Sequence, residues 1–271
     1  MPELPEVETT LQGIQPFTLN SSIKKFIIRN PNLRWPIDTK ALARIRQEKI
    51  IETSRRGKYL IITTAKGHFI IHLGMSGSLR IIDNKQLPQK HDHFDICLDS
   101  GIIIRYNDPR RFGCLLFTTD SPMLHDRLKH LGPEPLTRNF NAKQLYKDLN
   151  QRKVAIKSAI MDSKIVVGVG NIYATEALFL ARINPQKPAN SVSLAHLEAL
   201  VKAIKHILKK AIKSGGTTLR DFVNSDGKPG YFVQELKVYG RAGEACKVCT
   251  TRLELIKQNQ RTTVFCPKCQ S

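Results

Sequence analysis

The chain opens Met1-Pro2-Glu3, which puts a potential nucleophile and an acid side by side. Proline is small enough for the initiator methionine to be removed, and its removal would leave a secondary amine at Pro2. Such an amine attacks an aldehyde-like carbon and forms an iminium, which serves as an electron sink for bond cleavage. An α-amino group titrates at about pH 8, so a useful neutral fraction exists at physiological pH. The opening residues therefore indicate covalent amine catalysis.

The same residues also suit the start of a helix. Prolines and acids are favoured in the first turn of a helix. Apolar residues recur at helical spacing in Leu4, Val7, Leu11 and Ile14. The sequence therefore leaves two interpretations of Pro2 open, an N-terminal nucleophile or a residue that only helps to begin a helix.

Four of the six cysteines form two pairs, Cys246-x-x-Cys249 and Cys266-x-x-Cys269. This spacing is typical of a zinc site and not of a disulfide framework. Four thiolates close a tetrahedral shell with no open position, so the metal is expected to be structural and not catalytic. A disulfide or redox pair is the alternative, and no secretory signal supports it.

A glycine-rich turn, Gly168-Val169-Gly170-Asn171, lies in the middle of a segment predicted to be helical over residues 162–180. The glycines allow a tight turn with close backbone approach. A helix that begins near Asn171 offers free N–H groups to an anion such as a phosphate. A plain helix–turn–helix corner is the alternative interpretation.

Charge is the strongest compositional feature. Forty-three lysines and arginines against 23 aspartates and glutamates give a net charge of +20. A surplus of this size suits a polyanionic partner such as nucleic acid, although a basic surface also serves solubility. No apolar run reaches the roughly 18 residues of a membrane span, and the N-terminus lacks a basic segment followed by an apolar core. We therefore expect no membrane span and a cytoplasmic location.

The elements that must hold these residues change type along the chain. Short apolar stretches punctuated by turn residues are typical of a β-sandwich or barrel. The expected strands are 23–29, 59–64, 68–73, 78–82, 93–98, 102–106 and 114–118. Gly132 to Pro135 is the expected linker, and an apolar stripe at helical spacing follows over 197–212, with lysines expected to form a solvated face. Cys97 and Cys114 stand singly in apolar runs and are expected to be core residues.

Six motifs occur in one order along the chain. They are Pro2-Glu3-Leu4-Pro5-Glu6-Val7-Glu8, Ser54-Arg55-Arg56-Gly57-Lys58-Tyr59, His72-Leu73-Gly74-Met75-Ser76-Gly77, Asp108-Pro109-Arg110-Arg111-Phe112-Gly113, Val167-Gly168-Val169-Gly170-Asn171-Ile172-Tyr173 and the two cysteine pairs. Over essentially the entire chain, this set closely resembles the bacterial formamidopyrimidine-DNA glycosylases. The related endonuclease VIII enzymes usually have glycine where Leu4 stands, so the branch that acts on oxidised purines fits better.

The resemblance implies an α+β multidomain fold. We expect a catalytic β-sandwich domain with an N-terminal helix over residues 1–131 and a helical, DNA-binding domain with a helix-two-turn-helix element over 132–235. A zinc-finger hairpin is expected over 236–271. The resemblance also implies one structural zinc ion, damaged double-stranded DNA as the partner, and a monomer. The zinc ligands are then Cys246, Cys249, Cys266 and Cys269.

The resemblance also implies catalytic roles. In the family, the proline that matches Pro2 attacks C1′ of the damaged nucleotide and forms a Schiff base with the sugar. Glu3 would shuttle protons during ring opening and base loss. Lys58 would act with Glu3 in base removal and β-elimination, with a simple phosphate contact as the alternative. Arg261, expected near the tip of the zinc-bearing hairpin, would grip a phosphate and assist δ-elimination.

A base inside a duplex must be flipped out before an enzyme can reach it, and something must refill the gap. By resemblance, Met75 supplies an apolar wedge, Arg110 hydrogen-bonds the orphaned cytosine, and Phe112 stacks on a neighbouring base. Burial in the core is the alternative for Met75 and Phe112. The expected contacts to the DNA backbone are His91, Arg152 and Asn171.

Two smaller features remain open. His91-Asp92-His93 has residue types found in metal sites, but a phosphate contact through His91 is favoured. Arg152 stands where some relatives have lysine, which keeps the positive charge and changes the contact geometry. Residues 224–231 are polar and turn-forming, and by resemblance they close over the flipped base, with an idle surface loop as the alternative.

Together these features predict a bifunctional DNA glycosylase and abasic-site lyase that removes 8-oxoguanine and formamidopyrimidines from duplex DNA. Cleavage of the abasic site would follow by β,δ-elimination through the Schiff base. Two alternatives stay open. One is an endonuclease VIII-like glycosylase for oxidised pyrimidines, and the other is a DNA-damage-binding protein without catalysis.

Overall fold

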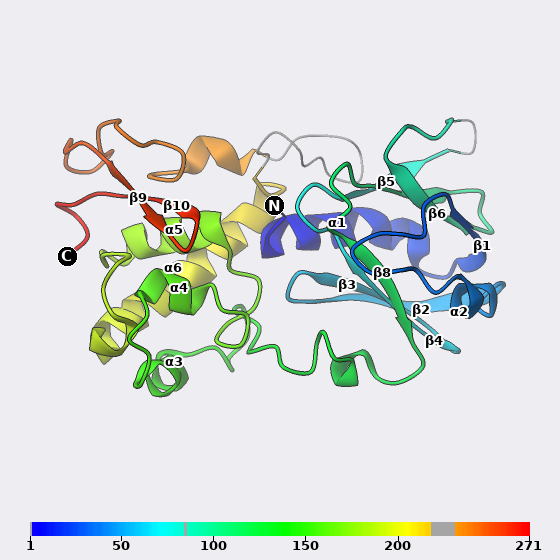
Figure 1. Cartoon of the computed structure of the whole chain (residues 1–271), viewed down its shortest axis with the longest axis horizontal. Coiled ribbons are helices and arrows are strands. Elements are labelled where there is room, and N and C mark those ends of the chain that lie inside the picture. Colours follow the sequence, from blue (N-terminus) through cyan, green and yellow to red (C-terminus); the bar gives the residue numbers. More distant parts are fainter. Residues whose placement is uncertain (1, 84–85, 218–230) are drawn as a thin grey trace. The chain divides into compact units, whose positions relative to one another are not determined.

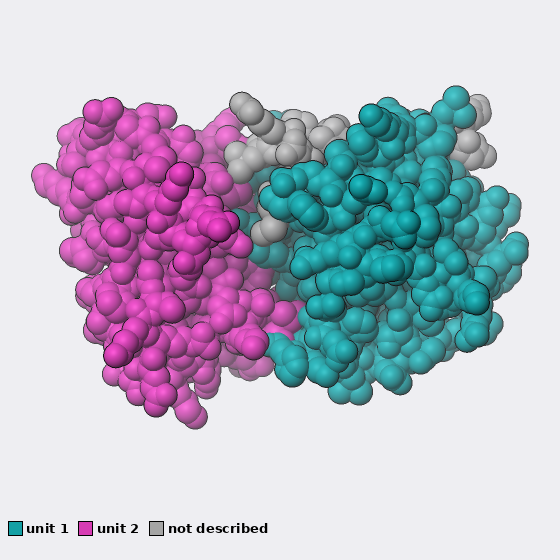
Figure 2. Space-filling view, viewed as in Figure 1, with its two compact units in different colours: residues 1–130, 214–231 teal, residues 131–213, 232–271 magenta. Residues whose placement is uncertain are grey.

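The computed structural model describes residues 2–83, 86–217 and 231–271. The chain forms two compact units, which Figure 2 distinguishes by colour. Unit 1 comprises residues 1–130 and 214–231, and unit 2 comprises residues 131–213 and 232–271. Each unit has a hydrophobic core of its own. None of the helices in the described residues combines the length and apolarity that a bilayer crossing needs.

Unit 1 begins with helix α1, Leu4–Thr18 (Figure 1). Glu3 is its N-cap, and Glu3 and Glu6 form a capping box. The carboxylate of Glu3 accepts the Glu6 N–H, and the carboxylate of Glu6 accepts the Glu3 N–H at 2.8 Å. The predicted apolar stripe is buried at Leu4, Val7, Leu11 and Ile14. The helix is therefore confirmed, and Pro2 lies directly before its cap.

Eight antiparallel strands follow in the sheet order β5-β7-β6-β1-β2-β3-β4-β8. They are β1 (Ser22–Ile28), β2 (Glu48–Arg56), β3 (Tyr59–Thr64), β4 (Gly67–His72), β5 (Ser78–Ile82), β6 (Asp92–Leu98), β7 (Ile103–Asn107) and β8 (Cys114–Thr118). Strand β1 pairs with β2 at Ser22 and Ile23 and with β6 further along its length, so two four-stranded halves meet at this corner. The Phe26 ring on β1 lies 5.1 Å from the Phe69 ring on β4, so the halves face each other as the predicted β-sandwich.

The seven expected strands are present with each boundary within one residue of its predicted position, but the sequence pattern does not predict β2. Only Ile50 and Thr53 of this strand are buried. An irregularity in the pairing between Ile50 and Glu52 breaks the two-residue alternation, since a bulge shifts the side chains that follow it. Helix α2 (Thr39–Ala43) and the short 3₁₀ helix η1 (Pro122–Leu124) complete the regular elements described in this unit.

Unit 2 is helical, with α3 (Ala142–Leu149), α4 (Ile156–Ile160), α5 (Asn171–Leu180), α6 (Leu194–Lys213) and the 3₁₀ segments η2 (Ala189–Ser191) and η3 (Phe232–Glu235). Helix α6 buries the predicted apolar stripe. The prediction of one helix over residues 162–180 is wrong, because the chain between Asp162 and Gly170 forms turns. Gly168 has a φ of 81°, which is outside helical geometry, and Gly170 caps the helix that starts at Asn171.

A hairpin of β9 (Glu254–Gln258) and β10 (Arg261–Phe265) belongs to the same unit. Asn259 and Gln260 form its turn with φ values of 47° and 62°, as a primed two-residue hairpin turn requires. Phe179 of α5 packs into the small core of this module. The Glu176 carboxylate, also on α5, accepts the backbone N–H groups of Lys237, Val238 and Tyr239. The helix and the module that carries the hairpin are therefore joined by apolar packing and by a charged cap.

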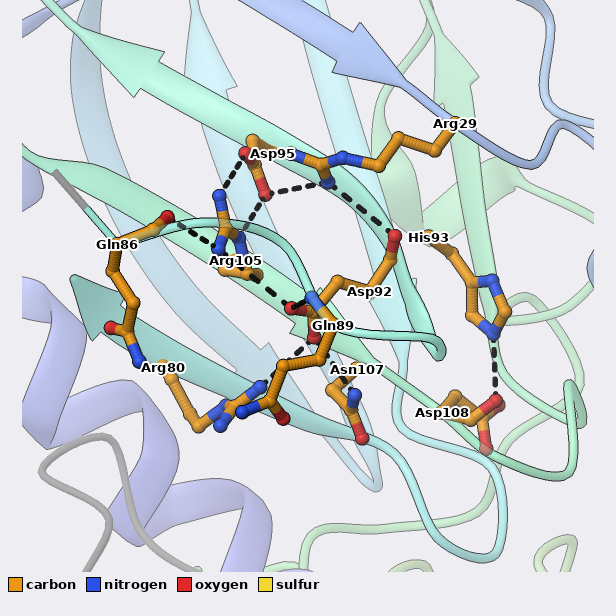
Figure 3. Close-up of polar contacts among 10 residues, drawn as sticks. All are labelled: Arg29, Arg80, Gln86, Gln89, Asp92, His93, Asp95, Arg105, Asn107 and Asp108. Atoms are coloured by element: carbon orange, nitrogen blue, oxygen red, sulfur yellow. Dashed lines mark hydrogen bonds and ion pairs between the residues drawn. The ribbon is translucent and has the colours of Figure 1, made fainter. Parts of the chain in front are cut away.

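Two buried carboxylates connect strands of the sandwich to three arginines (Figure 3). Asp95 accepts from Arg105 Nε at 2.9 Å and from Arg29 Nη1 at 3.0 Å. Asp92 accepts from Arg80 Nη2 at 2.9 Å. Burial alone would raise the pKa of Asp95, but the hydrogen bonds from Arg105 and Arg29 outweigh burial and hold the pKa below its ordinary value. Asp95 is therefore ionised and stabilises the folded state.

We expect Asp95→Asn to lower the free energy of unfolding at pH 7 by about 3 kcal/mol, because it leaves buried guanidinium groups short of a partner. The folded-state pKa of Asp95 lies below the unfolded value, so its stabilisation is present above about pH 4 and is lost at lower pH. Urea titrations from pH 7 to pH 3 measure this difference. The gap between the wild type and the variant should narrow below about pH 4, and a gap that stays constant would contradict the assignment. The exposed Asp120→Asn serves as the control.

Candidate functional site

The start of α1 brings two buried acids next to Pro2. Pro2 and Glu3 are both buried, and the capping box holds the Glu3 carboxylate against the first turn of the helix. The second oxygen of Glu6 accepts the Thr217 N–H at 2.7 Å. A carboxylate next to an N-terminal amine provides the acid–base partner that covalent amine catalysis needs.

Lys58 lies in the two-residue turn between β2 and β3, with Arg56 and Tyr59 paired on either side. Gly57 precedes it with a φ of 58°, a conformation that glycine adopts without strain. Arg55 holds the turn in place, because its Nε donates to Glu8 of α1 at 2.7 Å and its Nη1 donates to the Gly57 carbonyl at 2.9 Å. The helix that begins at Glu3 is thus tied to the turn that carries Lys58.

His72, at the end of β4, also belongs to this site, although it was not among the predicted site residues. Its ring centroid lies 4.8 Å from that of Tyr59, and its Nδ1 accepts the Gly74 N–H at 2.9 Å. Burial lowers the pKa of His72 to about 4, and the charges of Lys58 and Arg34 contribute to the shift. His72 is therefore a neutral imidazole near the positive charges of Lys58 and Arg34. The sequence signal that could have indicated His72 is its position as the first residue of the His72-to-Gly77 motif.

The three expected wedge residues are exposed on unit 1. Met75 is 36 % exposed and Phe112 is 44 % exposed, so the alternative of core burial is wrong for both. The Arg110 guanidinium lies 5.1 Å from the Phe112 ring centre in a cation–π contact. Gly74 has a φ of 69°, and a Cβ at this position would lie 2.4 Å from the Gly113 nitrogen. The loop that carries Met75 therefore packs directly on the loop that carries Arg110 and Phe112.

His91 is half-buried immediately before β6, and the two residues that follow it are buried. Asp92 belongs to the arginine network, and the Nε2–H of His93 donates to the Asp108 carbonyl at 2.7 Å (Figure 3). Among the described residues, the only group of His, Cys, Asp or Glu side chains with metal-binding geometry is the four-cysteine cluster. A metal site at residues 91–93 is therefore not supported.

In unit 2, Asn171 and the hairpin meet around a buried lysine. Lys157 Nζ donates to Asn171 Oδ1 at 2.7 Å and to Thr263 Oγ1 at 2.6 Å. Asn171 Nδ2 in turn donates to the Thr262 carbonyl at 3.1 Å. Arg261 is exposed at the first position of β10, beside the hairpin turn as predicted. The start of α5 and the strand that carries Arg261 are therefore held together.

A cavity of about 250 Å³ opens beside Arg261 and is lined by Lys157, Ser158, Met161, Asp162, Gln258, Asn259 and Arg261. Its cationic and amide groups suit an anion such as a phosphate. Arg152, the remaining expected backbone contact in this unit, pairs with Asp162 at 3.1 Å. The predicted closing loop, residues 224–231, lies outside the described residues except for Tyr231, which is exposed.

The four paired cysteines converge in the hairpin module. Their sulfurs all lie within 4.8 Å of one another, with Cys249 and Cys266 at 3.4 Å and Cys246 and Cys269 at 4.0 Å. Tetrahedral zinc with Zn–S bonds of about 2.3 Å separates its ligand sulfurs by about 3.8 Å. The Val248 N–H also donates to the Cys246 sulfur, as suits a thiolate. The four side chains therefore fit one structural zinc ion and leave no position open.

The other two cysteines are buried in the sandwich as predicted. Burial raises the pKa of Cys114 to about 12 and also raises that of Cys97. Both side chains are therefore protonated, unreactive core residues at physiological pH.

Comparisons with known proteins agree with this arrangement. Residues 1–115 match the profile of the formamidopyrimidine-DNA glycosylase N-terminal domain, residues 131–223 match its H2TH domain, and residues 243–271 match the zinc finger found in FPG and IleRS. A sandwich, an H2TH domain and a zinc finger in this order define a class of zinc-bearing DNA glycosylases. The chain belongs to the formamidopyrimidine-DNA glycosylase family.

Relatives match over the whole chain. The formamidopyrimidine-DNA glycosylase of Marinomonas sp. is 56 % identical over 272 residues, covering 100 % of both chains, and that of an Escherichia coli strain is 50 % identical over 270 residues with the same coverage. The crystal structure of the MutM (FPG) protein from Thermus thermophilus superposes with a TM-score of 0.89 at 35 % identity, covering 99 % of this chain and 98 % of that one. A Lactococcus lactis FPG variant in complex with DNA that contains Fapy-dG has a TM-score of 0.92 at 34 % identity, with 100 % of both chains covered.

We expect one zinc ion per chain by plasma mass spectrometry of the purified protein. The double variant Cys246→Ser, Cys266→Ser removes one ligand from each pair, so it should lose the metal and the ordered amide signals of β9 and β10. The physical reason is that Cys246 and Cys266 are also part of the small core of the module. Cys97→Ala is the matched control, because it removes a buried thiol outside the cluster. Full zinc content in the double variant would contradict the assignment.

We expect the His72 ring to stay neutral from pH 8 down to pH 5, because its pKa is lowered from 6.5 to about 4. The unfolded chain takes up the proton first, so this residue's contribution to stability is complete above about pH 6.5 and is lost as pH falls toward 4. Imidazole ¹H–¹⁵N correlation spectra, assigned with His72→Asn, measure the titration. A midpoint near 6.5 would disprove the proposed surroundings of the ring.

Proposed function

We propose that this protein is a bifunctional DNA glycosylase and abasic-site lyase, which excises 8-oxoguanine and formamidopyrimidines from duplex DNA. The observation that carries the proposal is the start of α1, where Pro2 lies next to the buried, capped Glu3. The ion pair between Glu8 and Arg55 ties this helix to the turn that carries Lys58. A secondary amine, a carboxyl group and a lysine thus share one rigid unit, and the family's DNA complexes supply the substrate class.

In the proposed reaction, loss of Met1 frees the Pro2 nitrogen. This amine attacks C1′ of the damaged nucleotide, the bond from C1′ to the base breaks, and the base leaves with a proton. Glu3 moves protons to and from the sugar as its ring opens and the Schiff base forms.

The Schiff base then acts as an electron sink. Loss of a proton from C2′ expels the 3′ phosphate in β-elimination, and a second proton loss expels the 5′ phosphate in δ-elimination. Lys58 assists base loss and the first elimination, and Arg261 holds a phosphate for the second. Cys246, Cys249, Cys266 and Cys269 would hold a zinc ion that fixes the hairpin carrying Arg261 and has no coordination position left for a reactant.

DNA binding is proposed for exposed residues of both units. Met75, Arg110 and Phe112 fill the gap left by the flipped base, while His91, Arg152 and Asn171 contact the backbone. The net charge of +20 favours a phosphate-rich partner. We also propose functional modules at residues 1–131, 132–235 and 236–271, a cytoplasmic location and a monomer on DNA.

The two alternatives have less support. An endonuclease VIII-like preference for oxidised pyrimidines is not favoured, because the curated relatives carry the formamidopyrimidine name. A DNA-damage-binding protein without catalysis has no physical need for Pro2, Glu3, Lys58 and Arg261 together.

Borohydride should trap the protein on a duplex that carries 8-oxoguanine opposite cytosine, and peptide mass spectrometry should place the crosslink on Pro2. We expect Pro2→Gly and Glu3→Gln to lose strand cleavage while they still bind abasic DNA. Lys58→Ala should lower the rate of base excision. Lys66→Ala is its matched control, because Lys66 occupies the turn between β3 and β4 of the same sandwich.

Two outcomes would overturn the proposal. Cleavage by both Pro2→Gly and Glu3→Gln would exclude the amine mechanism. A chain that lacks Met1, binds the duplex and gives no crosslink would point to another lesion, such as thymine glycol, or to a protein that binds without catalysis.

A further inference from the structure

Asp108 is a fully buried carboxylate that collects hydrogen bonds from two separate loops. Its Oδ1 accepts the Ser76 hydroxyl at 2.7 Å and the Arg110 N–H at 3.3 Å. Its Oδ2 accepts the Gly113 N–H at 2.9 Å and the Tyr106 hydroxyl at 3.1 Å. Both oxygens are therefore occupied by hydrogen-bond donors of the protein, and a buried polar group that loses such a donor is costly.

These donors sit at the bases of the loops that carry the exposed wedge residues. Ser76 directly follows Met75, and the N–H groups of Arg110 and Gly113 lie on either side of Phe112. One carboxylate therefore fixes the roots of both loops and leaves the side chains of Met75, Arg110 and Phe112 facing solvent.

The backbone of Asp108 adds a third connection. Its N–H donates to the His91 carbonyl at 3.0 Å, and its carbonyl accepts the Nε2–H of His93 at 2.7 Å (Figure 3). The same carbonyl accepts the Arg111 N–H at 3.2 Å. The segment that contains His91 is thus anchored to the same residue as the two wedge loops.

Close packing leaves the two loops no room to move closer together. A Cβ on Gly113 would lie 1.7 Å from the Tyr106 hydroxyl oxygen, and a Cβ on Gly74 would lie 2.5 Å from the Phe112 carbonyl carbon. Burial and the charge of Asp108 raise the pKa of Tyr106 well above its ordinary value, so its hydroxyl remains a donor. This packing and the hydrogen bonds to Asp108 together restrict the positions that the two loops can adopt.

We propose that Asp108 is the positioning residue that sets the spacing of Met75, Arg110 and Phe112, so that these three side chains fill the space of a flipped nucleotide together. It acts through the two loops and does not itself touch DNA. The proposal rests on the function proposed above and deepens it, because it assigns control of base flipping to a buried group.

The test compares two substrates that both form the Schiff base but differ in whether a damaged base must be flipped, removed and its place filled. Excision from a duplex with 8-oxoguanine opposite cytosine requires a base to be flipped and its place taken. Borohydride trapping on a single-stranded abasic oligonucleotide requires neither. A misplacement of about 1 Å at a positioned group costs on the order of 100-fold in rate.

Asp108→Asn keeps the shape of the side chain but puts an NH₂ group where an oxygen now accepts hydrogen bonds. We expect single-turnover excision from the duplex to fall by roughly 10- to 100-fold, while trapping on the single strand stays within about twofold of the wild type. The fluorescence change of 2-aminopurine beside the lesion, which reports flipping, should fall in parallel with excision.

Asp95→Asn is the matched control, because it removes an equally buried carboxylate that holds arginines and contacts neither wedge loop. Thermal melts identify a temperature at which both variants are folded, and the rates are measured at that temperature. Ser76→Ala and Tyr106→Phe each remove one donor to Asp108 and should give a smaller, duplex-selective loss. These two variants test the proposal even where Asp108→Asn fails to fold.

A loss of equal size on both substrates, or the same substrate selectivity in Asp95→Asn, would show a general structural role and overturn the proposal. Wild-type rates in Ser76→Ala, Tyr106→Phe and a folded Asp108→Asn would also overturn it. Wild-type protein that traps on neither substrate would instead contradict the proposed function, so the two failures are distinguishable.

Discussion

An ionised carboxylate leaves water at a cost of several kcal/mol unless donors within the protein replace that water. The buried acids Glu6, Asp95, Asp108 and Glu176 each accept hydrogen bonds from a part of the chain that is distant in sequence. Glu6 joins the start of α1 to Thr217, Asp95 joins two arginines, Asp108 joins two loops, and Glu176 joins α5 to the segment before the zinc module. Each of these carboxyl groups needs hydrogen-bond donors around it, so each one restricts which residues can lie beside it.

The side chains proposed to contact DNA are distinct from the buried residues that hold them in place. The side chains proposed to meet DNA stand in turns or at the ends of elements, which is where binding residues commonly lie. The residues that hold these side chains in place lie behind them in the fold. Arg55 holds the turn of Lys58, and Lys157 holds Asn171. Positions on well-packed elements keep catalytic groups within the narrow tolerances that chemistry requires.

Local patterns in the sequence sufficed for features that depend on local physics. Apolar alternation located seven strands, helical spacing located α6, and the paired cysteines located the metal cluster. Strand β2 escaped because a bulge near Ile50 breaks its alternation, and residues 162–170 were wrongly expected to be helical, whereas the expected helix start near Asn171 is confirmed. The surroundings of His72 and Asp108 arise from long-range contacts, which no spacing rule encodes.

The short turn between β2 and β3 limits insertions and deletions at this position in members of the family. One inserted residue would advance the chain by about 3.3 Å and turn the following side chains to the opposite face of the sheet. The Arg55 bond to the Gly57 carbonyl would be lost at the same time. Insertions and deletions should therefore be absent from this turn in active homologues, even though surface hairpins usually accept them with little loss of stability.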